Sequence, residues 1–229
     1  MEGLSLFLEN FANWESLGRV YPLLLQGLQL TIVLSVVTMP LAILAGLAIA
    51  LMYSFHVRWL NVLLVIYIDL FRSFPVLVLL ILVFYGLPFL GLTLPSFAAA
   101  VLAITLNNSG YYGEIFHAGI ESVPAGQREA AKSLGLGPGH TVFLVVLPQA
   151  VRKVLAPLAS NSLELVKTTS IASLVGLPEL LRSARVALEQ TYNPTPLMAA
   201  ALIYFILLWP FAHLVARLER RMLAQASAT

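Results

Sequence analysis

The longest uncharged stretch of the chain constrains its fold more than any other feature. Residues 20–55 contain no Asp, Glu, Lys or Arg. A transmembrane helix needs about 20 mostly apolar residues to cross the hydrocarbon layer, and this run is longer than that. Charged residues make up only 10% of the chain, against about 25% in soluble domains. The sequence therefore predicts an integral membrane protein.

Further apolar runs follow, and together they predict an all-α protein that crosses the membrane five times. A polar, glycine-containing loop at about 122–150 separates the third span from the fourth. Residues 178–191 are too polar to face lipid, so a short amphipathic helix at the membrane surface is expected there. The whole chain, 1–229, is interpreted as a single transmembrane domain. The expected spans are approximately residues 22–53, 59–85, 96–118, 152–175 and 196–216.

The distribution of basic residues predicts the orientation of these spans. Lys and Arg gather in the short loops on the cytoplasmic side of membrane proteins. Of the 13 basic residues, eight lie on one side of the five spans, three lie on the other, and Arg72 and Lys167 lie within or near spans. The eight are Arg58, Arg128, Lys132, Arg152, Lys153, Arg217, Arg220 and Arg221. This assignment places the N-terminus outside, and it places the loop at 122–150 and the C-terminus in the cytoplasm.

Several classes of function are disfavoured by the composition. A net charge of +2 is too small to suggest a nucleic-acid partner, and the absence of cysteine excludes disulfides and thiolate metal sites. The four histidines show no metal-binding spacing, so no metal site is expected. The chain has no G-x-x-x-x-G-K-[ST] phosphate loop, and no nucleophile–base pair typical of a membrane enzyme is visible.

The loop contains the segment QREAAKSLGLGPGHTVFLVVLPQA, which predicts two short helices at an angle. Ser122 or a neighbour can cap the first helix, which is expected to start near Pro124. Gly135 is a natural left-handed terminator for that helix. The second helix is expected to run to about Leu147, where Pro148 bends the path.

This loop resembles the EAA signature of importer-type ABC permeases. Glu129-Ala130-Ala131, Gly135 and Leu147-Pro148 stand at the family's spacing, and Val145 replaces the usual Ile. Flanking segments, among them IDLFRSFPVLVLLILVFYGLP and LPQAVRKVLAPLASNSLELVKTTSIASLVGLPELL, are similar to permeases for polar amino acids of the histidine, glutamine, arginine and glutamate type. The resemblance covers nearly the whole chain and implies the type I ABC importer permease fold.

The resemblance also implies a function. The chain would be the permease subunit of an ATP-driven importer of polar amino acids in the bacterial cytoplasmic (inner) membrane, and not itself an enzyme. Its expected partners are two ATPase subunits that bind ATP and magnesium, a second permease subunit, an outer solute-binding protein, the amino acid and membrane lipid. The chain itself would bind no cofactor. The residues expected to couple the loop to the ATPase are Glu129, Ala130, Ala131 and Gly135, with Arg128 and Lys132.

Each coupling residue also has a simpler interpretation. Glu129 stands in the first turn of a helix, where the helix dipole favours a carboxylate. Arg128 and Lys132, like Arg152 and Lys153, can act as orientation determinants that contact lipid phosphates. The presence of the whole signature favours the coupling role for Glu129.

Polar residues inside the predicted spans are candidates for a substrate path, because charges at membrane depth usually face a cavity or the bundle interior. Asp69 and Arg72, and likewise Glu164 and Lys167, are three residues apart and can pair. The alternative to a substrate path is a structural role. The charged residues would then form purely structural ion pairs, and Asn107 would make interhelical hydrogen bonds. A zwitterionic amino acid needs both an acceptor and a donor, which these clusters offer. The candidates are Asp69, Arg72, Asn107, Glu114, Glu164, Lys167, Thr168 and Ser170.

An ion-gradient-driven secondary transporter is the alternative function. Such proteins often contain an internal repeat with discontinuous helices. No convincing repeat is present, and the chain has only five predicted spans. The sequence leaves open which amino acid is carried and whether the permease pair is a homodimer or a heterodimer.

Overall fold

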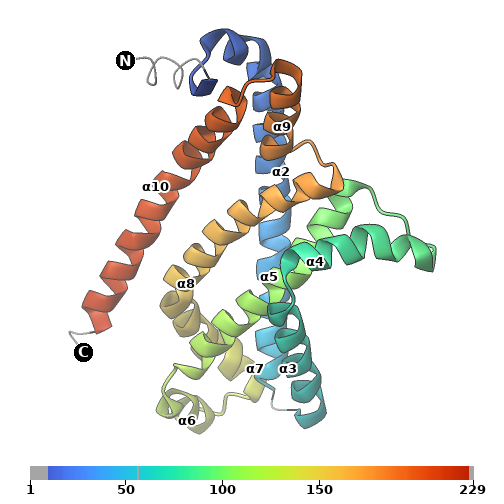
Figure 1. The fold of residues 1–229 in the computed structure, drawn as a ribbon. Coiled ribbons are helices and arrows are strands. Elements are labelled where there is room, and N and C mark those ends of the chain that lie inside the picture. Colours follow the sequence, from blue (N-terminus) through green and yellow to red (C-terminus); the bar gives the residue numbers. More distant parts are fainter. Residues whose placement is uncertain (1–9, 56, 227–229) are drawn as a thin grey trace.

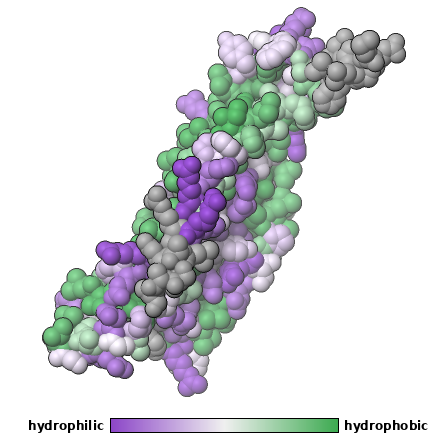
Figure 2. Space-filling model, turned by 90° about the vertical axis from the view of Figure 1, so that its left-hand side faces the viewer, coloured by the Kyte–Doolittle hydropathy of each residue, from purple (hydrophilic) through white to green (hydrophobic). Residues whose placement is uncertain are grey.

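The computed structural model describes residues 10–55 and 57–226, and this part of the chain is helical without any β-strand. Two long helices, α2 (Trp14–Tyr53) and α5 (Ser96–Glu121), lie side by side along the molecule, and α10 (Thr195–Ala226) leans away on one side (Figure 1). The all-α prediction is confirmed. Hydrophobic side chains cover large areas of the face in Figure 2, interrupted by groups of hydrophilic ones.

The first helix is longer than predicted. α2 starts at Trp14, where the Asn13 side chain accepts a hydrogen bond of 2.9 Å from the Ser16 backbone N–H. An ion pair between Glu15 and Arg19 stabilises the first turns. Its 40 residues span about 60 Å, roughly twice the thickness of the hydrocarbon layer. The apolar run predicts only the part of the helix that lies in lipid. The Asn13 cap allows the helix to begin before that run, at Trp14.

α2 and α5 approach each other closely because small residues line their contact. Ala42 and Ala50 of α2 and Ala99 and Ala103 of α5 are fully buried in one hydrophobic core. Gly46 marks the tightest point, since a Cβ at this position would lie 2.5 Å from the Tyr112 Cβ. Glycine is therefore required for this helix pair to pack as it does.

Gly46→Ala is expected to destabilise the protein by about 1–3 kcal/mol, as overpacking in a well-packed core typically does. The nearest obstacles include the Gly113 backbone nitrogen, at 2.7 Å, so a simple side-chain shift cannot relieve the clash. Thermal unfolding of the assembled transporter in detergent measures the effect. Gly18→Ala is the matched control on the same helix, because nothing lies within 4 Å of its Cβ position. Equal midpoints for the two variants would contradict the close approach.

The second predicted span is not one straight helix. α3 (Arg58–Ser73) and the segment Val76–Leu90, which begins with α4 (Val76–Ile81), meet at an angle of 98°. Phe74 at the break is extended, with φ −77° and ψ 125°, because the ring of Pro75 disfavours helical geometry in the residue before it. The prediction of a single helix over 59–85 is therefore wrong.

The loop between the third and fourth predicted spans is largely helical. Ser122 donates its hydroxyl to the Gly119 carbonyl at 2.7 Å, and the N-cap of α6 is Pro124, which makes no side-chain hydrogen bond, so the expected side-chain cap from Ser122 or a neighbour is wrong. The helical elements of this region are α6 (Ala125–Ser133), α7 (Pro138–His140), the π-helical turn η3 (Thr141–Val146) and α8 (Leu147–Thr168).

The second predicted helix does not stop at Leu147. The helical path runs without interruption from Pro138 to Val175, through α7, η3, α8 and the 3-10 turn η4 (Thr169–Val175). Proline lacks a backbone N–H and clashes with the carbonyl four residues earlier in a regular helix. The wide turn η3 precedes Pro148 and accommodates it, so the helix continues through this residue, and the path changes direction between α7 and α8 as expected (Figure 1). The predicted start of the fourth span at residue 152 falls inside this longer helix.

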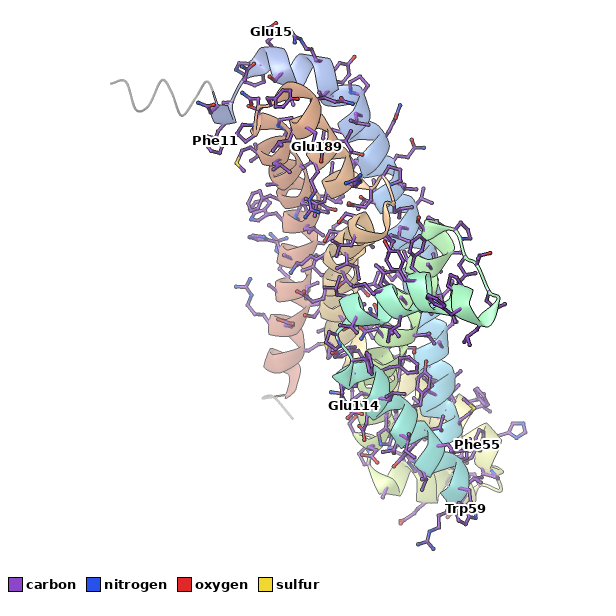
Figure 3. All side chains as sticks on the ribbon, turned by 45° about the vertical axis from the view of Figure 1, so that its right-hand side comes forward. Phe11, Glu15, Phe55, Trp59, Glu114 and Glu189 are labelled. Atoms are coloured by element: carbon purple, nitrogen blue, oxygen red, sulfur yellow. The ribbon has the colours of Figure 1, made fainter. Side chains whose placement is uncertain are left out.

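Three helical stretches in the described part of the chain are long and apolar enough to cross a membrane, or four if the bent pair α3–α4 is one span. The three are Trp14–Tyr53, Pro138–Val175 and Thr195–Arg220. Helix α5, the remaining predicted span, carries Asn107, Asn108 and Glu114, which lower its hydropathy. Figure 3 shows Glu15 and Glu189 near one end of the molecule and Phe55 and Trp59 near the other.

The predicted amphipathic helix is present as α9 (Leu180–Thr191), packed against α2 and α10. Glu179, which is fully buried, caps α9 and also accepts a hydrogen bond of 2.9 Å from the Tyr204 hydroxyl of α10. The Leu180 backbone N–H donates to the Thr31 hydroxyl of α2 at 3.1 Å. Burial raises the pKa of the Glu179 carboxyl, and hydrogen bonds from the Leu181 and Arg182 N–H groups and the Tyr204 hydroxyl partly offset that rise. The three helices are therefore joined by polar contacts at this point.

Candidate functional site

A polar cavity of about 410 Å³ lies at the break between α3 and α4. Helices α5 and α8 complete its walls. Its lining residues are Arg72, Ser73, Phe74, Pro75, Val76, Asn107, Asn108, Tyr111, Asn161, Glu164 and Thr168. Because one wall is the broken helix itself, the Phe74-Pro75 break and the cavity are parts of one feature.

Asn107 stabilises the break. A helix end leaves carbonyl groups without intrahelical donors. The Asn107 side-chain amide donates to the Phe71 carbonyl at 2.8 Å and to the Phe74 carbonyl at 3.2 Å. The alternative in which Asn107 makes interhelical hydrogen bonds is therefore confirmed, and the same residue also lines the cavity.

Asn107→Leu is expected to lower stability by about 2–4 kcal/mol, because two partly buried carbonyl groups lose their donor at roughly 1–3 kcal/mol each. The loss would appear as a lower thermal midpoint of the purified transporter. Asn61→Leu is a suitable comparison, since the Asn61 amide makes a single contact of 3.3 Å, to the Tyr53 carbonyl. A smaller effect at Asn107 than at Asn61 would contradict this account of the break.

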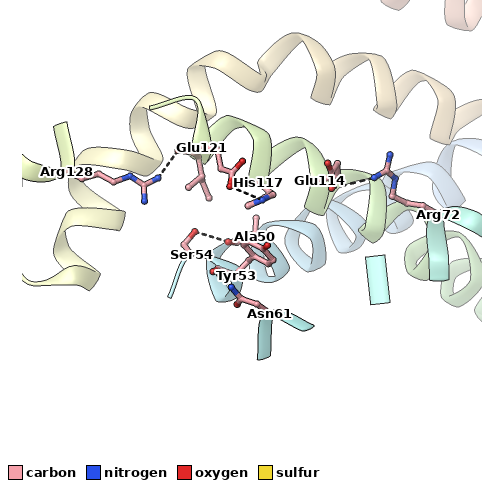
Figure 4. Close-up of polar contacts among 10 residues, drawn as sticks. Ala50, Tyr53, Ser54, Asn61, Arg72, Glu114, His117, Glu121 and Arg128 are labelled. Atoms are coloured by element: carbon pink, nitrogen blue, oxygen red, sulfur yellow. Dashed lines mark hydrogen bonds and ion pairs between the residues drawn. The ribbon is translucent and has the colours of Figure 1, made fainter. Parts of the chain in front are cut away.

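Arg72 pairs with a residue on another helix. Its guanidinium lies 3.5 Å from the Glu114 carboxylate of α5 (Figure 4). It also lies 5.5 Å from the centre of the Tyr111 ring. The expected pairing of Asp69 with Arg72 is therefore wrong. Asp69 is exposed, does not line the cavity, and forms no ion pair within the described part of the chain. Arg72 sits at the end of α3, where the break brings it against α5 instead.

The second predicted pair is confirmed. Lys167 Nζ donates to Glu164 Oε1 at 2.6 Å on the exposed side of α8. Glu164 and Thr168 line the cavity, whereas Lys167 lies on a separate pocket formed with α10. Ser170 donates its hydroxyl to the Lys167 carbonyl and is not part of the cavity wall.

The cavity thus brings together four of the eight predicted path residues, namely Arg72, Asn107, Glu164 and Thr168. Glu114 and Lys167 are connected to it through their ion pairs. Tyr111 and Asn161 were not predicted, although helical spacing could have found Asn161. It lies three residues before Glu164 and seven before Thr168, on the same face of α8.

The cavity wall offers both kinds of group that a zwitterion needs. The Glu164 carboxylate can accept from an ammonium group, and the Arg72 guanidinium can donate to a carboxylate. The Asn161 amide donates to Asn108 Oδ1 at 3.4 Å, which orients a further polar group on the wall. The arrangement suits recognition of a small polar solute, and it contains no nucleophile–base pair.

The loop at the other end of α5 has the predicted turn. Gly135 adopts φ +77°, the left-handed conformation, directly after α6. Its N–H donates to the Lys132 carbonyl at 2.9 Å, and the Leu136 N–H donates to the Ala131 carbonyl at 3.1 Å. These two bonds are the Schellman pattern that ends a helix at glycine. The predicted conformation of Gly135 is confirmed.

Two basic side chains bind the loop region to the last turn of α5. Arg128 of α6 donates to the Ile120 carbonyl at 2.9 Å (Figure 4). Lys153 of α8 donates to the Ser122 carbonyl at 2.7 Å. Cations are favourable at a helix C-terminus because the helix dipole places partial negative charge there. Helices α6 and α8 are therefore both attached to the end of α5.

Comparison with known proteins identifies the family. Residues 39–224 match the family model of the binding-protein-dependent transport system inner membrane component. The chain belongs to this family. It is therefore an ABC transporter permease subunit and not an enzyme, because ATP hydrolysis in these systems lies in a partner subunit.

Individual relatives agree with this assignment. The permease is 34% identical over 203 residues to the probable amino-acid ABC transporter permease protein YckA of Bacillus subtilis, covering 86% of this chain and 90% of that protein. It is 32% identical over 203 residues to the arginine transport system permease protein ArtQ of the same organism, covering 88% and 93%.

Solved structures share the fold of the permease. A chain in the crystal structure of an amino acid ABC transporter with histidines has a TM-score of 0.83 and 34% identity, covering 91% of this permease and 98% of that chain. The MetNI methionine ABC transporter, at 20% identity and a TM-score of 0.71, shows likeness of fold alone.

The permease exposes one side of α6. Glu129, Ala130 and Lys132 are exposed, whereas Ala131 is buried against the rest of the chain. The Glu129 carboxylate has no ion-pair partner among residues 10–55 and 57–226. Leu134, at the end of α6, is 82% exposed, and sequence reasoning did not single it out. An unpaired carboxylate and an exposed leucine together form a surface that a partner protein can cover.

Proposed function

We propose that this permease subunit moves polar amino acids into the bacterial cytoplasm and is driven by a separate ATPase that contacts α6. The observation that carries the proposal is that α5 connects the polar cavity to the loop. It carries Asn107 at the cavity and receives Arg128 and Lys153 at its last turn. The amino acid class is supported by the names of YckA and ArtQ, which the chain resembles over most of its length.

Substrate recognition is proposed to occur at the cavity wall. Arg72 and Glu164 each have a counter-ion within the chain, at 3.5 Å to Glu114 and 2.6 Å to Lys167. A bound zwitterion can exchange with these partially exposed pairs, because exposed ion pairs are worth only about 0–1 kcal/mol each. Exchange of this kind would release Glu114 and Lys167 from their pairs, and both of these side chains are partly exposed to solvent.

Transmission is proposed to run along α5. From Asn107 to Ile120 the helix covers about 20 Å, which a continuous helix spans as a stiff element. Movement of the loop region when two ATPase subunits close would be passed to α5 through Arg128 of α6 and Lys153 of α8, and from α5 to the break through Asn107. Glu129, Ala130, Lys132 and Gly135 would form the contact with the ATPase, whereas Ala131 is buried and would hold α6 against the rest of the permease.

We propose five membrane spans, with the bent α3–α4 pair as the second span and α5 as the third. The N-terminus would lie outside, and the loop containing α6 and the C-terminus would lie in the cytoplasm, as the asymmetry of basic residues indicates. The complete transporter would contain a second permease subunit, two ATPase subunits that hold ATP and magnesium, and an outer solute-binding protein. This chain would bind no cofactor itself.

Uptake by reconstituted vesicles tests the proposal. The permease, its ATPase and its solute-binding protein are reconstituted, and uptake of labelled polar amino acids is measured with and without enclosed ATP. The account predicts uptake only when ATP and the loaded binding protein are both present. Uptake by the permease alone in an ion gradient would instead support a secondary transporter.

A further inference from the structure

A second cavity differs in chemistry from the polar one. It is a groove of about 440 Å³ between α2, α8 and α10, on the side where α10 leans away from the other helices (Figure 1). Helix α2 contributes Ile32, Ser35, Val36, Met39 and Pro40 to its walls, and α8 contributes Ala159, Ser162, Leu163 and Val166. The α10 wall consists of Leu207, Leu208, Phe211, Leu214 and Val215.

The walls of this groove offer nothing to a polar solute. Its two polar residues are both satisfied inside the chain. Ser35 donates to the Thr31 carbonyl at 2.8 Å, and the Ser162 hydroxyl contacts the Leu158 carbonyl at 2.8 Å and the Tyr112 hydroxyl at 2.9 Å. A hydrocarbon chain can fill such a space without losing a hydrogen bond, whereas an amino acid cannot.

Basic residues stand at one end of the groove on both long walls. Arg152 lies seven residues before Ala159, on the same face of α8. Arg217 lies three residues after Leu214, along the α10 wall. Both arginines are exposed, and the start of α8 and the end of α10 both lie in the lower part of Figure 1. Glu219 is two residues from Arg217 and so projects from the opposite side of α10.

We propose that this groove binds an anionic phospholipid of the inner leaflet. One acyl chain would lie between α10 and the α2–α8 pair, and the headgroup phosphate would meet Arg152 and Arg217. Basic sites between transmembrane helices on the cytoplasmic side commonly hold anionic headgroups. The bound lipid would fill the space beside α10 and support its position. The inference rests on the proposed membrane orientation, but it does not depend on which solute the transporter carries.

Lipid retention by the intact transporter tests the site. The complex is reconstituted in phosphatidylethanolamine and phosphatidylglycerol in equal amounts, extracted into mild detergent, and examined by native mass spectrometry. Native protein is expected to retain one phosphatidylglycerol per permease subunit. Ala159→Phe, which fills the groove, is expected to abolish retention. Ala201→Phe, the same change at an exposed position of α10 outside the groove, is the control and should retain the lipid.

A charge variant tests the headgroup contact without altering the groove. Arg152→Gln with Arg217→Gln is expected to reduce retained phosphatidylglycerol by about tenfold and to remove the preference over phosphatidylethanolamine. Arg58→Gln, an exposed basic residue at the start of α3, is the matched control and should have no effect. Unchanged lipid retention in both the Ala159 and the arginine variants would overturn the proposal.

Photo-crosslinking identifies the occupant directly. A photoreactive phenylalanine derivative at position 208 of the assembled transporter is expected to give an adduct with the mass of a phospholipid. An adduct with a second copy of the permease would overturn the proposal, because the groove would then be a contact between subunits. Amino acid uptake by the native transporter is measured in parallel and separates the two proposals. Absence of uptake would contradict the transport function, whereas only the lipid and crosslinking results test the lipid site.

Discussion

Leu134→Asp is expected to weaken binding of the ATPase subunit about 100-fold. Leu134 is 82% exposed at the end of α6, next to the left-handed turn at Gly135. If the ATPase covers this side chain, its removal loses about 1.5–3 kcal/mol of apolar burial. The new carboxylate must also lose water without gaining a partner, which adds to the loss. Each 1.4 kcal/mol corresponds to a tenfold change in affinity.

The dissociation constant of the permease–ATPase complex in lipid discs measures this effect. Leu134→Met conserves volume and apolar character, so it serves as the control and should bind like the native permease. Affinity of the Asp variant within twofold of native would show that the ATPase does not cover the end of α6.

Replacing Arg128 and Lys153 together by Gln is expected to uncouple the transporter. Both side chains bind carbonyl groups at the end of α5, at 2.9 Å and 2.7 Å. Hydrogen bonds from charged groups are worth about 1.5–3 kcal/mol when buried, and solvent reduces that value for the exposed Lys153 contact. We expect amino acid uptake per ATP hydrolysed to fall about tenfold, while the subunits still assemble.

The ratio of uptake to ATP hydrolysis is the decisive readout, because a merely destabilised protein would lose both activities in proportion. Arg58→Gln removes a basic residue from α3 and should leave the ratio unchanged. An unaltered ratio in the Arg128 and Lys153 variant would mean that these contacts do not transmit movement.

Sequence reasoning located the helices better than it described their shapes. The uncharged run at 20–55 and the later apolar runs identify where lipid-facing helices lie, because hydropathy measures transfer into lipid directly. The same property cannot report the start of α2 at Trp14, which depends on a cap outside the apolar run. Nor can it give the 98° angle at Phe74, since proline in a membrane helix is compatible with a mild kink or a complete break.

Local spacing predicted contacts well only where both residues belong to one regular helix. The Glu164–Lys167 pair and the left-handed Gly135 turn depend on neighbours within a few residues, and both are present. Arg72 stands next to a break, so its partner Glu114 comes from α5, 42 positions further along the chain. Without knowledge of the break, the nearby Asp69 was the natural candidate. The exposure of Leu134 likewise depends on how α6 packs, which its sequence alone does not specify.

The measurement that tests the central claim most directly is the ATPase rate of the assembled transporter in lipid discs, with and without amino-acid-loaded binding protein. It compares the native permease with the combined Glu129→Lys and Gly135→Asp variant. The first change reverses the unpaired charge on α6, and the second places a side chain at φ +77°. We predict stimulation of the native complex and loss of stimulation or of assembly in the variant. Equal stimulation of both would contradict coupling through this loop.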